Sequence, residues 1–444
     1  MAKYLLLFFL FLKTIVSAQN LYFPPLTGNS WDTLSPAALG WCNDKIDSLL
    51  NYLEQRNTKA FIVLKDGKIV IEKYFGTFTQ DSIWYWASAG KTLTAFTVGI
   101  AQQEGYLSIN DTTSNYLGTG WTNCTITQEE KITIRHQLTM TSGLDDGVTD
   151  PYCTIDTCLK YKADAGTRWA YHNAPYTLLD NVIQSATGQN LNTYFTNKVK
   201  IPTGITGTFF YTGFNNVFYS KARSMARFGL LILNKGNWNG NQIMTDTAYF
   251  NQMVNTSQSL NESYGYLWWL NGKNSFMVPN TQFVFPGQLF PSAPSDMISA
   301  LGKDGQIINV VPSENLVVVR MGNAPLISQA VSITFNDTIW QKINELTCNS
   351  TLIETNSKNS FFNFYPNPTY DKLIIELPEW NEYQFTEVEI FDISGKLVYN
   401  QKNENFNSPL EINVTTLNQG IYFLTIKNKQ IPVLKEKFVV NKTF

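Results

Sequence analysis

The chain has few groups that bind metals and little charge. Its 444 residues include only two histidines and five cysteines, and charged residues make up 15% of the sequence. So few histidines, together with cysteine spacings unlike those of zinc sites, argue against a metal centre. The net charge of −2 gives no electrostatic reason to expect a nucleic acid or an anionic membrane as a partner.

Long hydrophobic runs are also scarce. The one clear run is Tyr4–Leu12, which follows Lys3 and precedes the small residues Val16-Ser17-Ala18. It is too short to cross a bilayer, and no other stretch qualifies, so we expect no transmembrane segment. A basic start, an apolar run and a small-residue cleavage site predict a signal peptide over residues 1–18 and an exported protein.

Cysteine is sparse enough to limit the possible cross-links. Five cysteines in an exported protein permit two disulfides and leave one thiol over. Cys153 and Cys158 are close enough in sequence to close a short loop. Cys42 and Cys348 could pair if the two ends of the first region pack together, which would leave Cys124. The connectivity itself cannot be read from the sequence.

An apolar content of 43% over this length predicts two or three domains with a large buried core. Residues 44–55 carry leucine and isoleucine at helical spacing, and a helix is expected from Ser88 to Glu104. An Asp-Gly turn at residues 65–68 between β-rich runs predicts a hairpin. Two further β-rich runs lie at residues 307–311 and 316–320. This order predicts an α/β domain whose sheet combines strands from both ends.

The composition changes after Cys348. Residues 349–360 are polar and are expected to form a linker. From residue 361 to 444, short β-rich runs alternate with turn residues, a pattern that predicts a small all-β sandwich. The expected strands are 373–377, 388–391, 397–399, 411–414, 420–426 and 437–440.

The strongest chemical signal is Ser88-Ala89-Gly90-Lys91. Residues three apart share one face of a helix, so the Lys91 amine can reach the Ser88 hydroxyl. Two further motifs follow in order, Tyr171-His172-Asn173 and Gly302-Lys303-Asp304-Gly305. Each motif has a simpler explanation, since Ser88 could be a helix N-cap and an Asp-Gly pair commonly marks a hairpin turn. The ordered set is harder to explain by chance.

This ordered set resembles the β-lactamase-related serine hydrolases, a family that includes class C β-lactamases, D-Ala-D-Ala carboxypeptidases, esterases and nylon-oligomer hydrolases. Residues 137–144 and 224–229 also resemble the family, and the likeness covers most of 40–345. The resemblance implies a β-lactamase/transpeptidase-like domain over residues 19–348, in which an antiparallel sheet and a helical subdomain form the walls of a cleft. It implies no cofactor.

The resemblance assigns the catalytic roles to Ser88, Lys91, Tyr171, Asn173 and Lys303. A serine hydroxyl needs a neighbouring base before it can act as a nucleophile. Lys91 can serve only as a neutral amine, which partial burial, Lys303 and the helix N-terminus would favour. A Tyr171 phenol between two lysines would be pushed toward phenolate, and Asn173 can hydrogen-bond Lys91 and the substrate.

The remaining assignments concern the substrate. The backbone N–H groups of Ser88 and Gln306 would form the oxyanion hole, and Gly305 would let the substrate backbone approach closely. His172 could touch the substrate but is expected to be a polar residue at the rim. Asp304 stands where family members often carry Thr or Gly. We therefore expect it to make anionic β-lactams and D-Ala-D-Ala peptides poorer substrates than neutral esters or amides.

A Ser-His-Asp triad fits less well, because the nucleophile elbow needs Gly-x-Ser-x-Gly and the local sequence is Trp86-Ala87-Ser88-Ala89-Gly90. Residues 264–269, Tyr-Gly-Tyr-Leu-Trp-Trp, are aromatic enough to be core or to form an apolar wall for an acyl group.

The tail resembles the C-terminal sorting domain of Bacteroidota proteins exported by type IX secretion. The matching residues are Tyr365-Pro366-Asn367-Pro368, Asp371, Gly395-Lys396-Leu397-Val398 and Gly420-Ile421-Tyr422. The resemblance implies that residues 361–444 engage the secretion machinery. It also implies release or surface attachment after removal of the tail. An independent carbohydrate-binding or adhesion module is the alternative.

Together these features predict an exported serine hydrolase that cleaves an amide or ester through an acyl-enzyme on Ser88. A true β-lactamase and a penicillin-binding D-Ala-D-Ala carboxypeptidase are alternatives within the same class. A catalytically inactive surface-binding protein is the alternative outside it.

Overall fold

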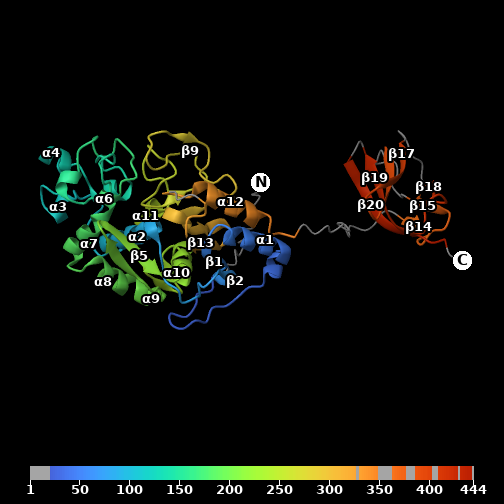
Figure 1. Ribbon diagram of the computed structural model, residues 1–444, viewed down its shortest axis with the longest axis horizontal. Helices are drawn as coiled ribbons and strands as arrows, with labels where there is room; N and C mark the ends of the chain where they lie inside the picture. The colour runs from blue at the N-terminus through green and yellow to red at the C-terminus, as the bar shows by residue number, and fades with distance from the viewer. Residues whose placement is uncertain are drawn as a thin grey trace, which may run out of the picture. The chain divides into compact units, whose positions relative to one another are not determined.

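The computed structural model describes residues 21–326, 330–348, 363–376, 386–402, 409–428 and 431–442 (Figure 1). The expected signal peptide and linker lie outside these residues. The chain divides into two compact units at Cys348. None of the helices in the described part combines the length and apolar character needed to cross a bilayer.

The first unit is built on a six-stranded antiparallel sheet with the strand order β2-β1-β13-β12-β11-β8. Strand β1 pairs with both β2 and β13, so the first and last long strands lie side by side, as the sequence predicts. The β1–β2 turn has Asp66 and Gly67 at φ 51° and 82°, the conformation that Asp-Gly hairpins require. The strands are β1 (Thr58–Lys65), β2 (Lys68–Tyr74), β8 (Trp269–Leu270), β11 (Ile298–Gly302), β12 (Gln306–Val311) and β13 (Leu316–Gly322).

Helices cover both faces of this sheet. On one face, α10 (Ala222–Leu233) lies so close that a Cβ at Gly229 would meet the Val317 side chain. On the other face, Asn336 of α12 (Ile333–Asn344) exchanges hydrogen bonds with Asn309 of β12 at 2.7 and 3.1 Å. Helix α1 (Asn43–Glu54) packs beside α12. Ile308, next to Asn309 on β12, also lies against Gly229, so successive residues of one strand contact different helices.

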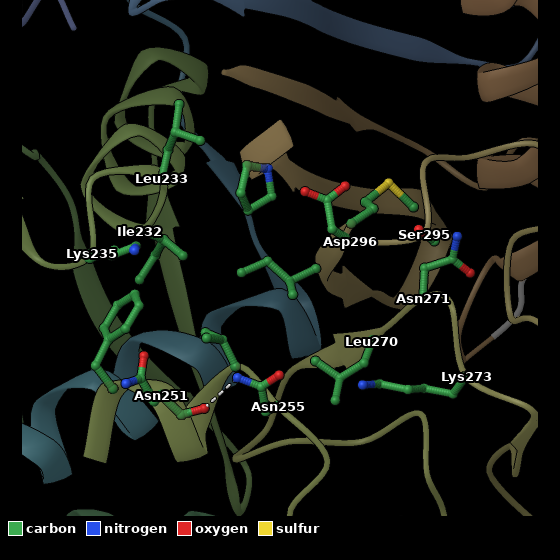
Figure 2. Close-up of a pocket in the computed structure, with 15 residues that line it drawn as sticks. Ile232, Leu233, Lys235, Asn251, Asn255, Leu270, Asn271, Lys273, Ser295 and Asp296 are labelled. Carbon is green, nitrogen blue, oxygen red and sulfur yellow. Dashed lines mark hydrogen bonds between the residues drawn. The ribbon is translucent and has the colours of Figure 1, made fainter. Parts of the chain in front are cut away.

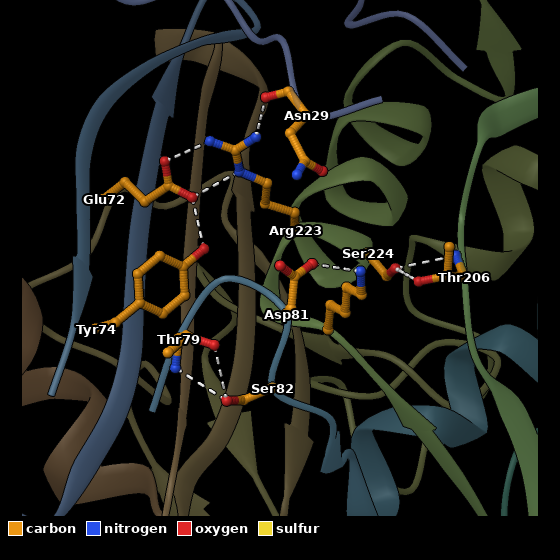
Figure 3. A network of polar contacts seen from close by, with 10 residues as sticks. Asn29, Glu72, Tyr74, Thr79, Asp81, Ser82, Thr206, Arg223 and Ser224 are labelled. Atoms are coloured by element: carbon orange, nitrogen blue, oxygen red, sulfur yellow. Dashed lines mark hydrogen bonds and ion pairs between the residues drawn. The ribbon is translucent and has the colours of Figure 1, made fainter. Parts of the chain in front are cut away.

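An ion-pair network joins α10 to the sheet (Figure 3). The Arg223 guanidinium donates to both carboxylate oxygens of Glu72 on β2, at 2.6 and 2.7 Å, and to the Asn29 carbonyl. The Tyr74 hydroxyl donates to the same carboxylate at 2.6 Å. A bidentate, partly buried pair of this kind fixes geometry better than an exposed one does.

The helical subdomain lies between β3 and β8 in sequence and contains the second motif. Its elements are α2 (Lys91–Gln103), α3 (Ser114–Leu117), α4 (Ile126–Glu129), α5 (Ile134–Leu138), α6 (Asn173–Thr177), α7 (Leu179–Thr187), α8 (Leu191–Phe195), α9 (Ile201–Thr203) and α11 (Thr247–Met253). The short strands are β3 (Trp84–Tyr85), β4 (Thr208–Thr212), β5 (Asn215–Ser220), β6 (Asn237–Trp238), β7 (Asn241–Gln242), β9 (Ser275–Phe276) and β10 (Phe285–Pro286). Single-turn elements are η1 (Pro36–Leu39), η2 (Ala87–Gly90), η3 (Asp156–Cys158), η4 (Thr196–Lys200), η5 (Lys303–Gly305) and η6 (Pro312–Glu314).

The second unit is all-β. A three-stranded sheet, β14-β15-β18, and a four-stranded sheet, β17-β16-β19-β20, share one hydrophobic core. Leu373 and Ile412 enter it from the first sheet, and Ile390 and Leu424 from the second. Its strands are β14 (Asn363–Tyr365), β15 (Lys372–Glu376), β16 (Glu387–Asp392), β17 (Leu397–Lys402), β18 (Leu410–Asn413), β19 (Gly420–Asn428) and β20 (Ile431–Val440).

Both disulfides considered from the cysteine spacing are present. Cys42 is bonded to Cys348, which ties the start of α1 to the end of the first unit. Cys153 is bonded to Cys158 and closes the short loop that precedes the second motif. Cys124 is not in a disulfide.

Candidate active site

Ser88 lies in a tight turn at the start of α2. The residues around it form the 3-10 turn η2, and the α-helix begins at Lys91, not at Ser88 as the sequence suggests. Ala87, immediately before Ser88, has φ 47°, a conformation that non-glycine residues rarely adopt. The turn is held by the Trp86 N–H, which donates to the Phe218 carbonyl at 2.8 Å. The surrounding packing offsets the conformational strain at Ala87, and the turn presents the Ser88 hydroxyl.

The Lys91 amine lies between two site residues. It donates to Ser88 Oγ at 2.9 Å and to Asn173 Oδ1 at 2.8 Å. The side chain is 3% exposed, and its Nζ lies 4.4 Å from the centroid of the Tyr176 ring. The first and second motifs therefore meet at one nitrogen.

Burial lowers the pKa of Lys91 to about 7. A charged amine loses its hydration in such an environment, so the neutral form becomes accessible near neutral pH. Burial is the cause of this shift. Lys303, which was expected to lower the pKa of Lys91 as well, is not among the causes of this shift.

Tyr171 is surrounded by aromatic rings. It stacks on Trp269 with ring centroids 5.8 Å apart, and it meets Tyr264 edge to face at 6.3 Å. Burial raises the pKa of Tyr171 above its ordinary value, while its hydrogen bond with Ser88 acts in the opposite direction. The expected phenolate is therefore wrong. Tyr171 is a neutral phenol at neutral pH, because desolvation of the anion outweighs the neighbouring groups.

The aromatic segment 264–269 belongs to the core. Its four aromatic side chains are at most 1% exposed, so they cannot form an open wall for an acyl group. Two of them, Tyr264 and Trp269, nevertheless pack directly on Tyr171. The segment therefore packs against the second motif and holds the Tyr171 ring in place.

His172 is not at the rim. It is 2% exposed, and neither ring nitrogen has a hydrogen-bond partner among the described residues. Burial lowers the pKa of His172 to about 4, although Asp146 and Asp145 nearby act to raise it. His172 was expected to be a polar rim residue that could touch the substrate, and this expectation is wrong. The imidazole is enclosed by the protein and is neutral at physiological pH.

The third motif forms a turn. Lys303–Gly305 make up η5 between β11 and β12, and Asp304 has φ 62°. The Lys303 side chain is exposed. The Asp304 carboxylate accepts a hydrogen bond from the Tyr85 hydroxyl at 2.8 Å, and its carbonyl accepts one from Arg320 at 2.6 Å. The simpler expectation for an Asp-Gly pair, a hairpin turn, is the one that holds.

The two glycines of this motif have different neighbours. A Cβ at Gly305 would lie 2.9 Å from an Arg320 nitrogen, so its missing side chain makes room for the guanidinium and not for a substrate backbone. A Cβ at Gly302 would lie 2.3 Å from the Trp86 carbonyl oxygen and 3.0 Å from the Ala89 nitrogen. Gly302 therefore lets the end of β11 lie against the turn that carries Ser88.

Gln306 begins β12 and pairs with Gly302. Its side chain is buried and makes two hydrogen bonds to the backbone of Gly322 on β13. It donates to the Gly322 carbonyl at 2.6 Å and accepts from the Gly322 N–H at 3.1 Å. Strand β12 packs against η2. The second oxyanion donor expected from the Gln306 backbone is thus carried by a strand that contacts the nucleophile turn.

Three important residues lie outside the assignments made from sequence. Gly302 was part of a motif but had no role, and Tyr176 supports the Lys91 amine with its ring. Arg320 is fully buried and donates to the carbonyls of Asp304 and Gly305 within η5 and to the carbonyl of Asn323 after β13. A lone arginine within the run Leu-Val-Val-Val-Arg-Met-Gly was the available signal, because buried charges need dedicated partners.

A separate pocket of about 270 Å³ lies elsewhere on the first unit (Figure 2). It is lined by Ile232 and Leu233 of α10, with Lys235 and Lys273 at its edge. None of the residues assigned to the catalytic site lines it. This pocket is therefore separate from the candidate active site.

Comparison with known proteins follows the same division of the chain. Residues 47–330 match the family model described as Beta-lactamase. The chain belongs to the Beta-lactamase family. Residues 363–441 match the model described as Secretion system C-terminal sorting domain, so the second unit is a sorting tail that indicates export by type IX secretion.

The chain is similar to individual proteins at low sequence identity. An uncharacterized protein of Alkalihalophilus pseudofirmus is 26% identical over 304 residues, covering 60% of this chain and 83% of that protein. A provisionally assigned 6-aminohexanoate-dimer hydrolase from Bacillus anthracis aligns with a TM-score of 0.54 at 18% identity, covering 73% of this chain and 91% of that one. A family VIII carboxylesterase aligns with a TM-score of 0.54 at 13% identity, covering 69% and 99%. These structures share the fold.

Proposed function

We propose that this chain is an exported serine hydrolase that cleaves an ester or amide through an acyl-enzyme on Ser88. The observation that carries the proposal is the buried Lys91 amine between Ser88 Oγ and Asn173 Oδ1. In its neutral form, Lys91 can donate an N–H to Asn173 and direct its lone pair to the Ser88 hydroxyl. This is the arrangement that a serine nucleophile without a histidine base requires.

The proposed steps follow from these contacts. Lys91 Nζ accepts the Ser88 proton as Oγ bonds to the substrate carbonyl carbon, and the carbonyl oxygen becomes an oxyanion. The backbone N–H groups of Ser88 and Gln306 would stabilise that oxyanion. Tyr171, a neutral phenol, can give its proton to the leaving alcohol or amine and recover one from Lys91. Water then attacks the acyl carbon by the reverse path, which frees Ser88.

The substrate class is the second part of the proposal. The Asp304 carboxylate places a negative group in the turn beside the site, next to Tyr85. We infer that neutral esters and linear amides react better than β-lactams or D-Ala-D-Ala peptides, which carry a carboxylate. Similarity in fold to a 6-aminohexanoate-dimer hydrolase and to a family VIII carboxylesterase supports this range. Efficient penicillin hydrolysis that is unchanged in Asp304→Thr would contradict it.

The test follows intact mass and product release together. The full chain is incubated separately with p-nitrophenyl acetate and with benzylpenicillin, beside Ser88→Ala and the control Ser82→Ala, whose hydroxyl contacts Thr79. Release of p-nitrophenol that disappears only in Ser88→Ala supports the proposal. Release that persists in Ser88→Ala overturns it.

The penicillin samples separate the alternatives. A lasting mass increase on Ser88 would indicate a penicillin-binding peptidase, and loss of the drug without a lasting adduct would indicate a β-lactamase. Ligand binding without turnover in wild type and Ser88→Ala alike would indicate a surface-binding protein.

The remaining proposals concern export. Residues 1–18 would be removed as a signal peptide, and residues 349–360 would act as a linker to the sorting domain at 361–444. Type IX secretion would then release the protein or attach it to the outer cell surface after removal of the tail. Intact mass of the protein recovered from culture medium would show which segments remain.

A further inference from the structure

A row of aromatic side chains crosses the small sheet β3-β5-β4. Tyr85 on β3 lies directly opposite Tyr219 on β5, and Tyr219 lies opposite Thr208 on β4. Residues opposite one another share a face, and Phe210, two residues after Thr208, lies on that face too. The ring centroids of Tyr85 and Tyr219 are 6.4 Å apart, and those of Tyr219 and Phe210 are 5.8 Å apart. We call Tyr85, Tyr219 and Phe210 the aromatic stripe.

The stripe is on the outer face of the sheet. The inner face carries Phe209 and Phe218, which are 4% and 0% exposed and pack on Phe195 in the core. On the outer face, Phe210 is 56% exposed, and Tyr85 and Tyr219 are half-buried. Contiguous exposed aromatic surface is uncommon on soluble proteins and often marks a binding site.

One end of the stripe lies at the nucleophile turn. Tyr85 is three residues before Ser88, and its hydroxyl donates to the Asp304 carboxylate in η5. The hydrogen bond from Trp86 N–H to the Phe218 carbonyl continues the β3–β5 ladder into η2. Strand β5 also packs against η2. The stripe therefore extends from the candidate site across the sheet.

The chemistry of this face selects the kind of group that could bind. The hydroxyls of Tyr85 and Thr208 are already engaged, by Asp304 and by Asn192 at 2.9 Å. The other residues of the face, Thr212, Asn215 and Val217, carry no charge. Ring faces thus dominate over hydrogen-bonding groups, and no basic residue lies among those named, which favours a flat apolar ring over an anion or a ligand held mainly by hydrogen bonds.

Binding of a peptide as an added strand is disfavoured at the edge of the same sheet. Strand β4 is one of the two edge strands, and the Asn192 side chain accepts from the Phe209 N–H at 2.8 Å and donates to its carbonyl at 2.9 Å. The centre of the edge is therefore already paired, so an incoming strand would have to displace Asn192.

We propose that the aromatic stripe binds an aryl ring of the substrate, so that aryl-substituted esters or amides are the preferred class. This inference rests on the proposed function of Ser88. Offset or edge-to-face contacts with two or three rings would lower KM for such substrates. Because the stripe does not contact the reacting atoms, kcat for the smaller substrates should not depend on it.

The test compares matched esters on the full chain by pH-stat. One series runs from benzyl acetate to 4-phenylbutyl acetate and is compared with butyl acetate. The other is ethyl 4-phenylbutyrate compared with ethyl butyrate, so that the ring is placed on either side of the scissile bond. We expect at least one aryl member to exceed its alkyl partner in kcat/KM by about tenfold, through KM, as about 1.4 kcal/mol of ring contact would give.

Tyr219→Ala and Phe210→Ala should each reduce this preference, leaving kcat for the alkyl ester unchanged. Tyr106→Ala is the control, since Tyr106 is 45% exposed but lies beyond the end of α2 opposite Lys91. Alkyl-ester turnover with no aryl preference, or with a preference that both variants retain, would overturn the inference and leave the proposed function standing. Absence of any Ser88-dependent turnover of esters and of amides would overturn both.

Discussion

The two sides of the candidate site differ in how their residues are held. On the helical side, Lys91 and Tyr171 are buried, and each has a hydrogen bond to Ser88. On the sheet side, the Lys303–Gly305 turn exposes Lys303 and is fixed mainly through its backbone, by Arg320. The first side has the features needed to move protons, whereas the second has those needed to shape an opening.

This difference indicates where one family can vary without losing its chemistry. Residues that change protonation must be desolvated to have useful pKa values, so their surroundings are fixed by packing. A turn that is fixed through its backbone can change its side chains at little cost to the fold. On this view the helical side determines whether the chain is a hydrolase, and the turn affects which substrate it accepts.

The largest expected effect is on the helical side. Lys91→Met keeps the length of the side chain and its packing on Tyr176 but removes the amine. We expect kcat/KM for p-nitrophenyl acetate to fall by about 10³-fold or more, since general base catalysis contributes up to about 10⁴-fold.

Thermal unfolding should show the opposite trend for Lys91→Met. Replacing a buried amine by a thioether removes a desolvated polar group, so the variant should be at least as stable as wild type. A variant that retains wild-type activity would place the catalytic base elsewhere and remove the contrast between the two sides.

The next largest effect tests the contact between the two sides. Gly302→Ala places a Cβ 2.3 Å from the Trp86 carbonyl, which must move the Ser88 turn or the end of β11. A displacement of about 1 Å near reacting groups can cost about 10²-fold in rate. We expect a loss of that order in kcat while the protein remains folded by circular dichroism.

Gly147→Ala provides the control for Gly302→Ala. Gly147 has an ordinary φ, and its Cβ would meet only the end of the Asp145 side chain, so activity should stay near wild type. Equal activities of the two variants would show that close packing of β11 on the turn does not position Ser88.

The pH dependence of kcat/KM should follow the titration of Lys91, on the helical side of the site. Because the pKa of Lys91 is lowered to about 7, the neutral base is lost as the pH falls below that value. kcat/KM should therefore rise about tenfold per pH unit up to about 7 and then level off. Tyr171→Phe should lower the whole curve but keep the same acid limb, because the pKa of Tyr171 is raised and the phenol does not titrate there. If the acid limb of the kcat/KM profile shifts in Tyr171→Phe, the titrations of Lys91 and Tyr171 are coupled.

Local sequence signals predicted the parts of the molecule that depend on neighbours in the chain. The hairpin at Asp66-Gly67, the helix that carries Lys91 and the strands of the sorting domain follow from turn residues and periodicity. The order of the three motifs was sufficient to indicate the family, and Lys91 does contact Ser88 and Asn173.

Effects that depend on distant segments were missed. Burial raises the pKa of Tyr171, and the Trp269 and Tyr264 rings that pack on it are brought there only by the fold. His172 is enclosed near Asp145 and Asp146, and no pattern within its own motif shows this. For the third motif, the turn preference of Asp-Gly predicted the local structure, whereas the contacts of the turn with Arg320 and Tyr85 depend on distant segments.

The smallest expected effect concerns Lys303. Family resemblance makes it a catalytic residue, whereas its side chain is exposed on η5 and does not contribute to the shift at Lys91. An exposed cation is screened by solvent and salt, so Lys303→Ala should change kcat for a neutral ester by less than about threefold. Any larger effect should appear in KM for an anionic substrate and should weaken as salt is added. A salt-independent fall in kcat of about 10²-fold would instead mean that Lys303 turns inward when substrate binds, and the turn would then belong with the catalytic side of the site.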